Sequence, residues 1–471
     1  MMQMRWSILG VAIAQIATAQ NNAAFDTFFI PQTLRIDYFH SGIATEEKIA
    51  VDQIYAGGEW PESRTRLFDD LNLGHYLLRA SDAATNQVIF SRSYSTLFNE
   101  WQTTGEAKSG LFKTMHETAR MPLPKKPVIV EILRRDKQNY YTQQLLATVI
   151  DPASRFVSRE NRALPAEVFS LIKNGASPNK VDVAVLADGY TAAQKQKFAN
   201  DAKRLMDIFF EHSPFKENKQ HFNVSTVFVA SSDAGPDDPR AGQWRNTPLG
   251  MSFNTFDTDR YMMSIENRAI QDAASNVPFD YIIILINSTK YGGGGIFRFY
   301  AGTTVDNEQS AYVLVHEFGH SFAQLADEYF SSDVAYSDIY PVGVEPWEPN
   351  ITRLLDAPEV KWKQFVEKDM PIPTPWDQAG YFKLEEERVK AIQAAKTETE
   401  KQNLRQQYRN QLDSLFVNQK YWNKTGAFEG AGYLAKGLYR PTLRSIMISG
   451  TRDFGPVNTA AIQRVIDFYT K

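Results

Sequence analysis

The segment that most restricts the fold is the run Tyr-Ile-Ile-Ile-Leu-Ile at residues 281–286. A strand that is apolar at every position has no face for water, so it belongs in a sheet that is covered on both sides. Residues 181–187 form a second apolar run, which is followed by a turn at residues 188–190. Residues 191–194 then fit a capping box and predict a helix that ends near Phe210. This strand–helix–strand order predicts an α/β or α+β region in the second part of the chain.

The first part of the chain, from residue 24 to about residue 150, follows a different pattern. Short runs that alternate apolar and polar residues recur there between turn residues. The runs at residues 128–133 and 141–146 flank a polar segment that suits a hairpin loop. Several short strands at this spacing predict a β-sandwich. The region holds no group of residues with recognisable catalytic chemistry, so we interpret it as an accessory domain.

The whole chain is therefore expected to have an α+β fold with two domains. A β-sandwich accessory domain is expected at residues 20–160 and a catalytic domain at residues 161–471. Residues 383–416 are charged and rich in helix-forming residues, with a thin apolar stripe. This composition predicts a helical insertion in the second domain, as one long helix or as a helical hairpin.

The first nineteen residues are typical of a secretory signal peptide. Arg5 supplies a positive charge, residues 6–19 are apolar or small, and Ala17-Thr18-Ala19 is a small-x-small cleavage site. Cleavage after Ala19 would leave Gln20 at the mature N-terminus and would place the protein in the periplasm, on the cell surface or outside the cell. No later segment has about 18 uninterrupted apolar residues, so the sequence predicts no membrane span.

Composition excludes several classes of site. The chain has no cysteine, which excludes disulfides, thiolate metal ligands and a cysteine nucleophile. The net charge is −4, and no run of lysine or arginine suits a nucleic-acid backbone. Residues 292–295 are four glycines, but they lack the Lys-Ser/Thr ending of a P-loop. We interpret them as a place where backbone approaches backbone, beside an expected strand at residues 296–300.

The strongest chemical signal is His316-Glu317-Phe318-Gly319-His320. Two histidines four residues apart on a helix share one face, and both imidazoles can reach one zinc ion at about 2.0–2.1 Å. Glu317, next to the first histidine, can take a proton from the attacking water as a general base. The chain has only seven histidines, so a chance match to this pattern is rare. The helix is expected to begin near residues 307–310, with Asp306 or Asn307 as its N-cap.

A catalytic zinc site of this kind needs a third protein ligand. No histidine follows His320, so a downstream ligand must be another residue type. In an unbroken helix Asp327 would lie about 10 Å along the axis from His320, so it can bind only if the helix ends first and the chain turns back. We predict Asp327 as the third ligand and Glu328 as a hydrogen-bond partner of a ligating histidine. The alternatives are Glu328 itself or a more distant glutamate, Glu345 or Glu348.

Residues 316–329, HEFGHSFAQLADEY, are similar to the signature of the bacterial IgA-peptidase family of zinc metallopeptidases. Residues 186–191, 232–235 and 445–447 also resemble segments of that family, and the resemblance extends into the β-rich N-terminal region. It implies a zincin fold for the catalytic domain. It also implies that Met447 is the methionine of a Met-turn beneath the metal.

The chain departs from the metzincin pattern in two places. Ala323 and Ala326 stand where that pattern has a glycine and a third histidine. The departure leaves the third ligand open. It also leaves open which tyrosine stabilises the oxyanion, because the sequence places neither Tyr433 nor Tyr439 near the metal.

These observations favour a secreted zinc-dependent metallopeptidase that hydrolyses peptide bonds of proteins or glycoproteins. The alternative is a catalytically inactive zincin-like module that binds a protein or a glycan. The intact set of His316, Glu317 and His320 favours the enzyme. The family resemblance does not fix a substrate, because pocket residues rather than the metal helix set specificity.

Overall fold

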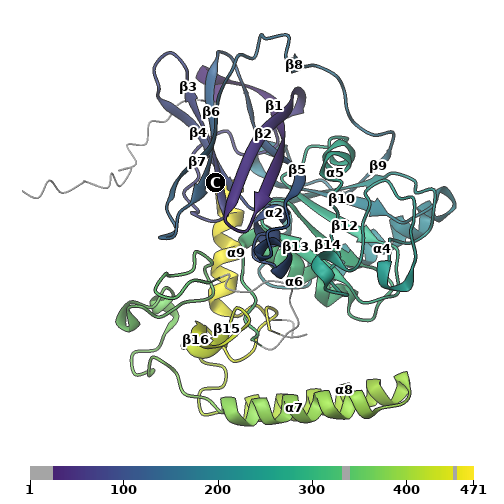
Figure 1. Ribbon diagram of the computed structural model, residues 1–471, viewed down its shortest axis with the longest axis vertical. Helices are drawn as coiled ribbons and strands as arrows, with labels where there is room; N and C mark the ends of the chain where they lie inside the picture. The colour runs from purple at the N-terminus through teal and green to yellow at the C-terminus, as the bar shows by residue number, and fades with distance from the viewer. Residues whose placement is uncertain (1–24, 331–339, 449–452) are drawn as a thin grey trace, which may run out of the picture.

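The computed structural model describes residues 25–330, 340–448 and 453–471. The predicted signal peptide, residues 1–19, lies outside the described residues. Figure 1 shows the N-terminal strands at one end of the molecule, an α/β part beside them, and a helical hairpin that projects from the C-terminal part. None of the helices that the structure describes is both long enough and apolar enough to cross a bilayer.

The N-terminal region consists of two four-stranded sheets that share one apolar core. Leu34 and Ile36 of one sheet pack in this core with Leu78 and Ile132 of the other. The hairpin expected around residues 128–146 is present, because β6 pairs with β7. The first sheet has the order β5-β1-β2-β8, with β1 (Phe29–Ile43), β2 (Glu46–Glu59), β5 (Lys113–Pro124) and β8 (Val157–Ser158). The second has the order β4-β3-β6-β7, with β3 (Tyr76–Asp82), β4 (Val88–Tyr94), β6 (Val128–Arg135) and β7 (Tyr141–Ile150).

Three short helices belong to this region: α1 (Phe25–Phe28), α2 (Leu97–Trp101) and α3 (Gly105–Lys108). Thr96 begins α2 with a capping box, in which its hydroxyl accepts from Asn99 N and the Asn99 side chain accepts from Thr96 N. The apolar side of α2, Phe98 and Trp101 included, packs into a cluster of the second part of the chain. This short helix is therefore anchored on the neighbouring sheet.

The second part of the chain is built on a six-stranded sheet of order β13-β14-β12-β10-β11-β9. Its four central strands are parallel, and both edge strands run antiparallel to their neighbours. Every residue of β10 and β12 is buried, as their apolar sequences predicted. The bounds are β9 (Glu167–Ile172), β10 (Val181–Asp188), β11 (Phe222–Phe228), β12 (Tyr281–Ile286), β13 (Gly293–Ile296) and β14 (Tyr300–Thr304).

Helices cover both faces of this sheet. On one face α4 (Lys195–Phe209), α6 (Ser310–Ala323) and α9 (Gly455–Thr470) enclose a large aromatic and aliphatic core. On the other face α5 (Asn267–Ala274) shares a second core with α2. The predicted helix after β10 is present, although its first turn, Ala192–Gln194, is a 3-10 turn. Further 3-10 turns lie at Ser177–Asn179, Lys219–His221, Pro239–Ala241, Thr255–Asp257, Ala357–Glu359 and Lys363–Phe365.

One strand prediction was wrong. Residues 296–300 do not form one strand: residues 297–299 form the turn between β13, which ends at Ile296 and lies largely on the glycines, and β14, which begins at Tyr300. Arg298 adopts a positive φ of 56° in this turn. The local sequence alternates aromatic residues with arginine, as a strand would. Arg298, however, lies in the turn and contacts Glu62 of the N-terminal region.

That contact belongs to a set of buried ion pairs that join the two parts of the chain. Glu62 accepts hydrogen bonds from Arg92 in its own region and from Arg298 across the junction. Arg35 donates to Asp272 of α5 at 2.5 Å. Removing one partner of such a buried pair typically costs about 3–5 kcal/mol, because the other charge is left uncompensated. The N-terminal sheets are therefore held firmly against the central sheet.

The helical insertion is a hairpin of α7 (Gln378–Ala394) and α8 (Glu398–Val417). The chain leaves the helical conformation at Ala395, and Thr397 caps α8 by accepting from Glu400 N. The ring centres of Tyr381, near the start of α7, and Phe416, near the end of α8, are 5.9 Å apart, so the two helices are antiparallel. Beyond the hairpin, β15 (Phe428–Ala431) and β16 (Leu434–Arg440) form a two-stranded sheet.

Candidate metal centre

Helix α6 places the histidines of the motif at the surface of a cleft and its aromatic residues in the core. Phe318 and Phe322 are fully buried against Phe215, whereas His316 and His320 line the cleft. The expected N-cap was wrong, because the helix begins at Ser310 with Gln309 before it and no side-chain cap. Asn307 instead accepts a hydrogen bond from Gln309 N and stabilises the preceding turn.

The Nε2 atoms of His316 and His320 face each other, and the distance between them is 3.1 Å. On the opposite side of each ring, Nδ1 donates to a backbone carbonyl: His316 to Ile446 O at 3.0 Å and His320 to Leu325 O. With the proton on Nδ1, each Nε2 carries a free lone pair. Two lone pairs that converge in this way suit a shared cation.

The helix ends before Asp327, as a ligand at that position requires. Gln324 takes the left-handed conformation, with φ 46° and ψ 44°, and the chain turns back towards the helix. The turn brings Asp327 Oδ1 to 3.1 Å from His316 Nε2 and to 3.4 Å from His320 Nε2. Ligands at zinc distances in a tetrahedral site lie roughly 3.3–3.5 Å from one another. The three atoms therefore have the spacing of metal ligands, and Oδ1 is buried without a hydrogen bond of good geometry among the described residues.

Glu328 has a different place from the one that the sequence suggested. Its fully buried carboxylate accepts hydrogen bonds from Asn350 and Asn458 at 2.9 Å and from Ser445 at 2.6 Å, and it contacts neither histidine. Its backbone N–H donates to Met447 O. The expected partnership with a ligating histidine is thus wrong, since backbone carbonyls fill that role. Glu328 instead ties the turn after α6 to the segment that holds Met447.

The more distant glutamates do not reach the histidines. Glu345 accepts a hydrogen bond from Arg353 N and lies 3.4 Å from Lys361 Nζ. Glu348 lines the cleft, where its carboxylate lies 3.4 Å from the Tyr340 hydroxyl.

Met447 is fully buried beneath α6. A Cβ added to Gly319, between the two histidines, would lie 3.1 Å from Met447 Sδ. The glycine of the motif therefore lets the methionine pack directly against the helix. Ile446, the residue before it, provides the carbonyl that orients His316. One short segment near the C-terminus thus supports the helix from below and fixes the orientation of a histidine.

The charges of the cluster are strongly coupled. Burial raises the pKa of the Glu317 carboxyl, although both neighbouring histidines oppose this shift. Burial alone would lower the pKa of His320, but the Asp327 carboxylate outweighs it and raises that pKa to about 9. The two histidines hold the pKa of Asp327 well below its usual range despite its burial. Asp327 is therefore an anion, and the cluster favours a positive charge between its members.

The glycine run forms the backbone beside Glu317. A Cβ on Gly295 would collide with the Glu317 carbonyl, and one on Gly293 would collide with Val313 of the same helix. The interpretation of these glycines as a close approach of two backbones is confirmed. The approach brings the edge strand β13 against the motif, so that Glu317 lies between a helix and a strand edge.

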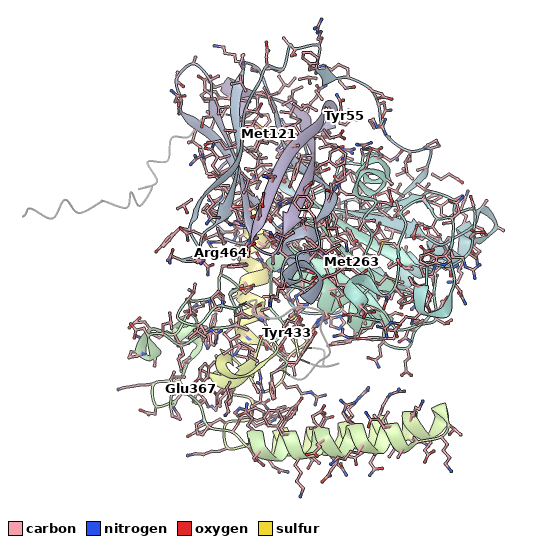
Figure 2. The ribbon with its side chains drawn as sticks, in the orientation of Figure 1. Tyr55, Met121, Met263, Glu367, Tyr433 and Arg464 are labelled. Atoms are coloured by element: carbon pink, nitrogen blue, oxygen red, sulfur yellow. The ribbon has the colours of Figure 1, made fainter. Side chains whose placement is uncertain are left out.

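The tyrosines differ in position. The Tyr433 hydroxyl donates a hydrogen bond to Asp327 Oδ2, and Tyr433 lies in the turn between β15 and β16 near the centre of the molecule (Figure 2). Tyr439 lies on β16, pairs with Thr352 and does not line the cleft. The sequence alone gave no sign of Arg260, which lines the cleft and hydrogen-bonds the Tyr329 hydroxyl.

The cleft extends to both sides of the cluster. On one side it has a volume of ≈ 200 Å³, and residues around α2 form part of its wall. On the other side a hollow of ≈ 230 Å³ is bordered by Tyr381 and Glu385 of α7. Arg260 and Glu317 border both hollows. The N-terminal region and the helical hairpin thus form walls of the same groove, which no motif in either segment predicts.

The comparisons with known proteins agree with this geometry. The model of the family described as IgA Peptidase M64 matches residues 169–466, and the model described as Peptidase M64 N-terminus matches residues 24–146. A search of curated proteins finds no match. Within the first match lies a group of His316, Glu317 and His320 whose candidate ligand atoms are all within 4.8 Å of one another. The chain therefore belongs to the IgA peptidase M64 family, carries that family's N-terminal domain, and is a metallopeptidase, a hydrolase of peptide bonds.

Proposed function

We propose that the protein is a secreted, zinc-dependent peptidase that cleaves proteins or glycoproteins, with zinc held by His316, His320 and Asp327. The observation that carries this proposal is the convergence of two histidine Nε2 atoms and one buried carboxylate oxygen within 3.4 Å of one another. A set of two nitrogens and one oxygen suits zinc and leaves a fourth position for the reaction.

Zinc, when bound, would supply a Lewis acid for the scissile carbonyl and for the attacking water. Glu317, beside the cluster and buried between α6 and β13, takes the proton of that water and passes it to the leaving nitrogen. Its raised pKa suits both steps, because a weakly acidic carboxyl is the better base. Tyr433 holds Oδ2 of Asp327, which leaves Oδ1 directed at the histidines.

The proposal also includes a more detailed assignment of the two domains. We regard residues 20–160 as a β-sandwich accessory domain and residues 161–471 as a zincin-type catalytic domain with a helical insertion. The common core of the two N-terminal sheets supports the sandwich. The metal helix beneath a mixed sheet, with β13 antiparallel at its edge, supports the zincin assignment.

Metal analysis and hydrolysis together test the function. The purified protein should contain about one zinc per chain, and it should cleave casein or a mixed peptide pool. A chelator should abolish cleavage, and added zinc should restore it. A protein that binds zinc but cleaves no peptide, and instead retains a protein or glycan ligand, would support the inactive binding module.

The export proposal is tested separately. N-terminal sequencing of the protein isolated from its native host should give a start at or near Gln20. The signal at residues 1–19 supports this expectation. A cytoplasmic protein that retains Met1 would contradict it.

A further inference from the structure

The N-terminal region contributes side chains to the cleft of the proposed peptidase. Its strands lie away from the metal cluster, but helix α2 and its flanks reach the cleft and supply Ser95, Asn99, Glu100 and Thr103. In Figure 1, α2 lies where the N-terminal strands meet the central sheet, next to β13. A segment of the accessory region therefore borders the place where substrate must lie.

Glu100 is the acidic group of this segment. Its carboxylate accepts a hydrogen bond from the Tyr261 hydroxyl. Within the three described stretches of the chain, no lysine or arginine forms an ion pair with it. Two other acids of the region do have cationic partners: the buried Glu62 pairs with Arg92, and the exposed Glu106 pairs with Lys113. Glu100 thus lines the cleft as a carboxylate without a countercharge of its own.

The position of Glu100 is fixed by the packing of its helix. Phe98 and Trp101, on either side of it in sequence, are buried in the core beneath the central sheet. The helix start is held by the Thr96 capping box, and Ser95 N donates to Phe297 O of the β13–β14 turn. A helix anchored at its start and along one side holds its charged residue at a defined place in the cleft. A fixed charge of this kind can select a ligand without first being ordered.

We propose that Glu100, with Tyr261 as its hydrogen-bond donor, forms a specificity subsite that binds a positively charged group of the peptide substrate near the scissile bond. The inference rests on the peptidase function proposed above. The cationic group can be a lysine or arginine side chain, or the free ammonium at the N-terminus of a peptide. Both carry the same charge, and the experiment below separates them.

Electrostatics supports this choice of ligand. An enclosed carboxylate without a lysine or arginine partner is costly, and a substrate cation would offset that cost. Burial raises the pKa of Glu100 to about 7, although the hydrogen bond from Tyr261 and the charge of His320 oppose this shift. Arg260 also lines the cleft, but the hydrogen bond that its guanidinium forms there is to Tyr329 and not to Glu100.

The first experiment uses the full-length zinc-loaded protein and a peptide pool derived from digested proteins. One half of the pool has free N-termini and the other half is N-acetylated. Mass spectrometry of the products should show lysine or arginine enriched at one fixed position from the cut, in both halves. Enrichment of cuts at a fixed distance from free N-termini, lost on acetylation, would identify the terminal ammonium as the ligand. Cleavage with neither preference would overturn the inference while leaving the peptidase function intact.

The second experiment assigns the preference to Glu100. A cleaved peptide is compared with its copy in which norleucine replaces the selected lysine or, for the terminal ammonium, with its N-acetylated copy. The wild-type protein should prefer the cationic peptide by roughly 10- to 100-fold in kcat/KM. Glu100→Gln should remove that preference, so that the cationic and the neutral peptide are cleaved with kcat/KM values within about threefold of each other. The matched control Glu106→Gln, in which the replaced carboxylate already pairs with Lys113, should retain the preference.

Each further outcome also has a definite meaning. A preference that persists in a folded Glu100→Gln protein would overturn the assignment to Glu100. Should that variant fail to fold, the wild-type comparison of the lysine and norleucine peptides, or of the free and acetylated peptides, still decides whether a cation subsite exists. No cleavage of any peptide in the pool would overturn the peptidase function itself, and this inference with it.

Discussion

The N-terminal region and the peptidase region contribute to the same cleft in different ways. The peptidase region concentrates its chemistry in five consecutive residues of α6, His316 to His320. The N-terminal region contributes scattered residues such as Ser95, which follows β4, and Glu100 of α2, and these residues match no motif. The difference shows that chemistry can be confined to one helical turn, whereas the walls that select a substrate are assembled from distant segments.

The two regions also meet at the end of the metal helix. Gln324, the residue in the left-handed conformation after α6, accepts a hydrogen bond from Gly74 N and lies 3.4 Å from the Ser95 hydroxyl. The turn that carries Asp327 is thus held by backbone and side chains of the N-terminal region. Four changes, ordered from the largest expected effect to the smallest, test how far the two regions act separately.

The first change, Glu317→Gln, should affect chemistry alone. Loss of a general base typically lowers kcat by about 10²- to 10⁴-fold. The metal content and the melting temperature should stay near those of wild type, because both histidines and Asp327 remain. Peptide hydrolysis, elemental analysis and thermal unfolding check the three quantities. Near-normal turnover by this variant would exclude Glu317 as the base.

The second change compares two neighbouring acids of the peptidase region. Asp327→Ala should weaken zinc binding by more than about 100-fold, because a ligand is lost. Glu328→Gln should retain zinc but lower the free energy of unfolding by about 2 kcal/mol, since an amide cannot accept all three of its present hydrogen bonds. Zinc titration and denaturant unfolding separate the effects. The reverse ranking would assign the ligand role to Glu328.

The third change tests the N-terminal region by itself. His40 is fully buried between Glu117 and Glu47. Burial alone would lower the pKa of His40, but these carboxylates raise it to about 9. Because this pKa lies above the unfolded value of 6.5, the stability from His40 is fully present below pH 6.5 and is lost as the pH rises to about 9. The loss amounts to something on the order of 3 kcal/mol.

The measurement is the free energy of unfolding of wild type and of His40→Gln at about pH 6 and about pH 9.5. The wild-type protein should be less stable at the higher pH, and the variant should show a smaller difference between the two. Equal pH dependence in both proteins would mean that His40 is not protonated in the folded state. Metal binding by the variant at neutral pH should stay intact, since His40 does not line the cleft.

The fourth change breaks the contact between the regions. Gln324→Ala removes the hydrogen bond to Gly74 N and should lower kcat/KM several-fold, by about 1 kcal/mol in transition-state free energy. Gln324→Gly loses the same bond but relieves the positive φ of 46°. The glycine variant should therefore be more stable than the alanine variant while being equally impaired. Full activity in both would show that the turn to Asp327 holds without the N-terminal region.

Much of the peptidase region could be predicted because its signals are local. A run such as residues 281–286, apolar at every position, can only be a buried strand, and β12 is one. The capping box at Thr191 predicted the start of a helix in the right place. The spacing of His316 and His320 fixes their common face through the helical repeat alone. Such features depend on residues within one or two turns of each other, so the sequence is enough to establish them.

Two of the predictions that were wrong concerned residues whose place depends on how the chain packs rather than on their own composition. Residues 296–300 have the composition of a strand, but β13 ends at Ile296 and pairs with β14 from Tyr300, so residues 297–299 form a hairpin loop. Glu328 stands next to Asp327 yet bonds to Asn350, Asn458 and Ser445, and not to a histidine. After a helix has ended, the side chains of adjacent residues such as Asp327 and Glu328 can point in different directions. Only their tertiary contacts decide the direction of each.

The sequence by itself indicated where the chemistry lies, because His316 and His320 share one helix face and Glu317 stands beside them. It also determined that the sheet beneath that helix is covered on both sides, because its central strands have no polar face. The tertiary structure decided which carboxylate approaches the histidines, which carbonyls orient their rings, and that Glu100 of the N-terminal region lines the cleft. The physical reason is the sequence separation over which each feature is determined. Helical spacing depends on residues a few positions apart, whereas an ion pair, a turn or a cleft wall depends on which distant segments pack together.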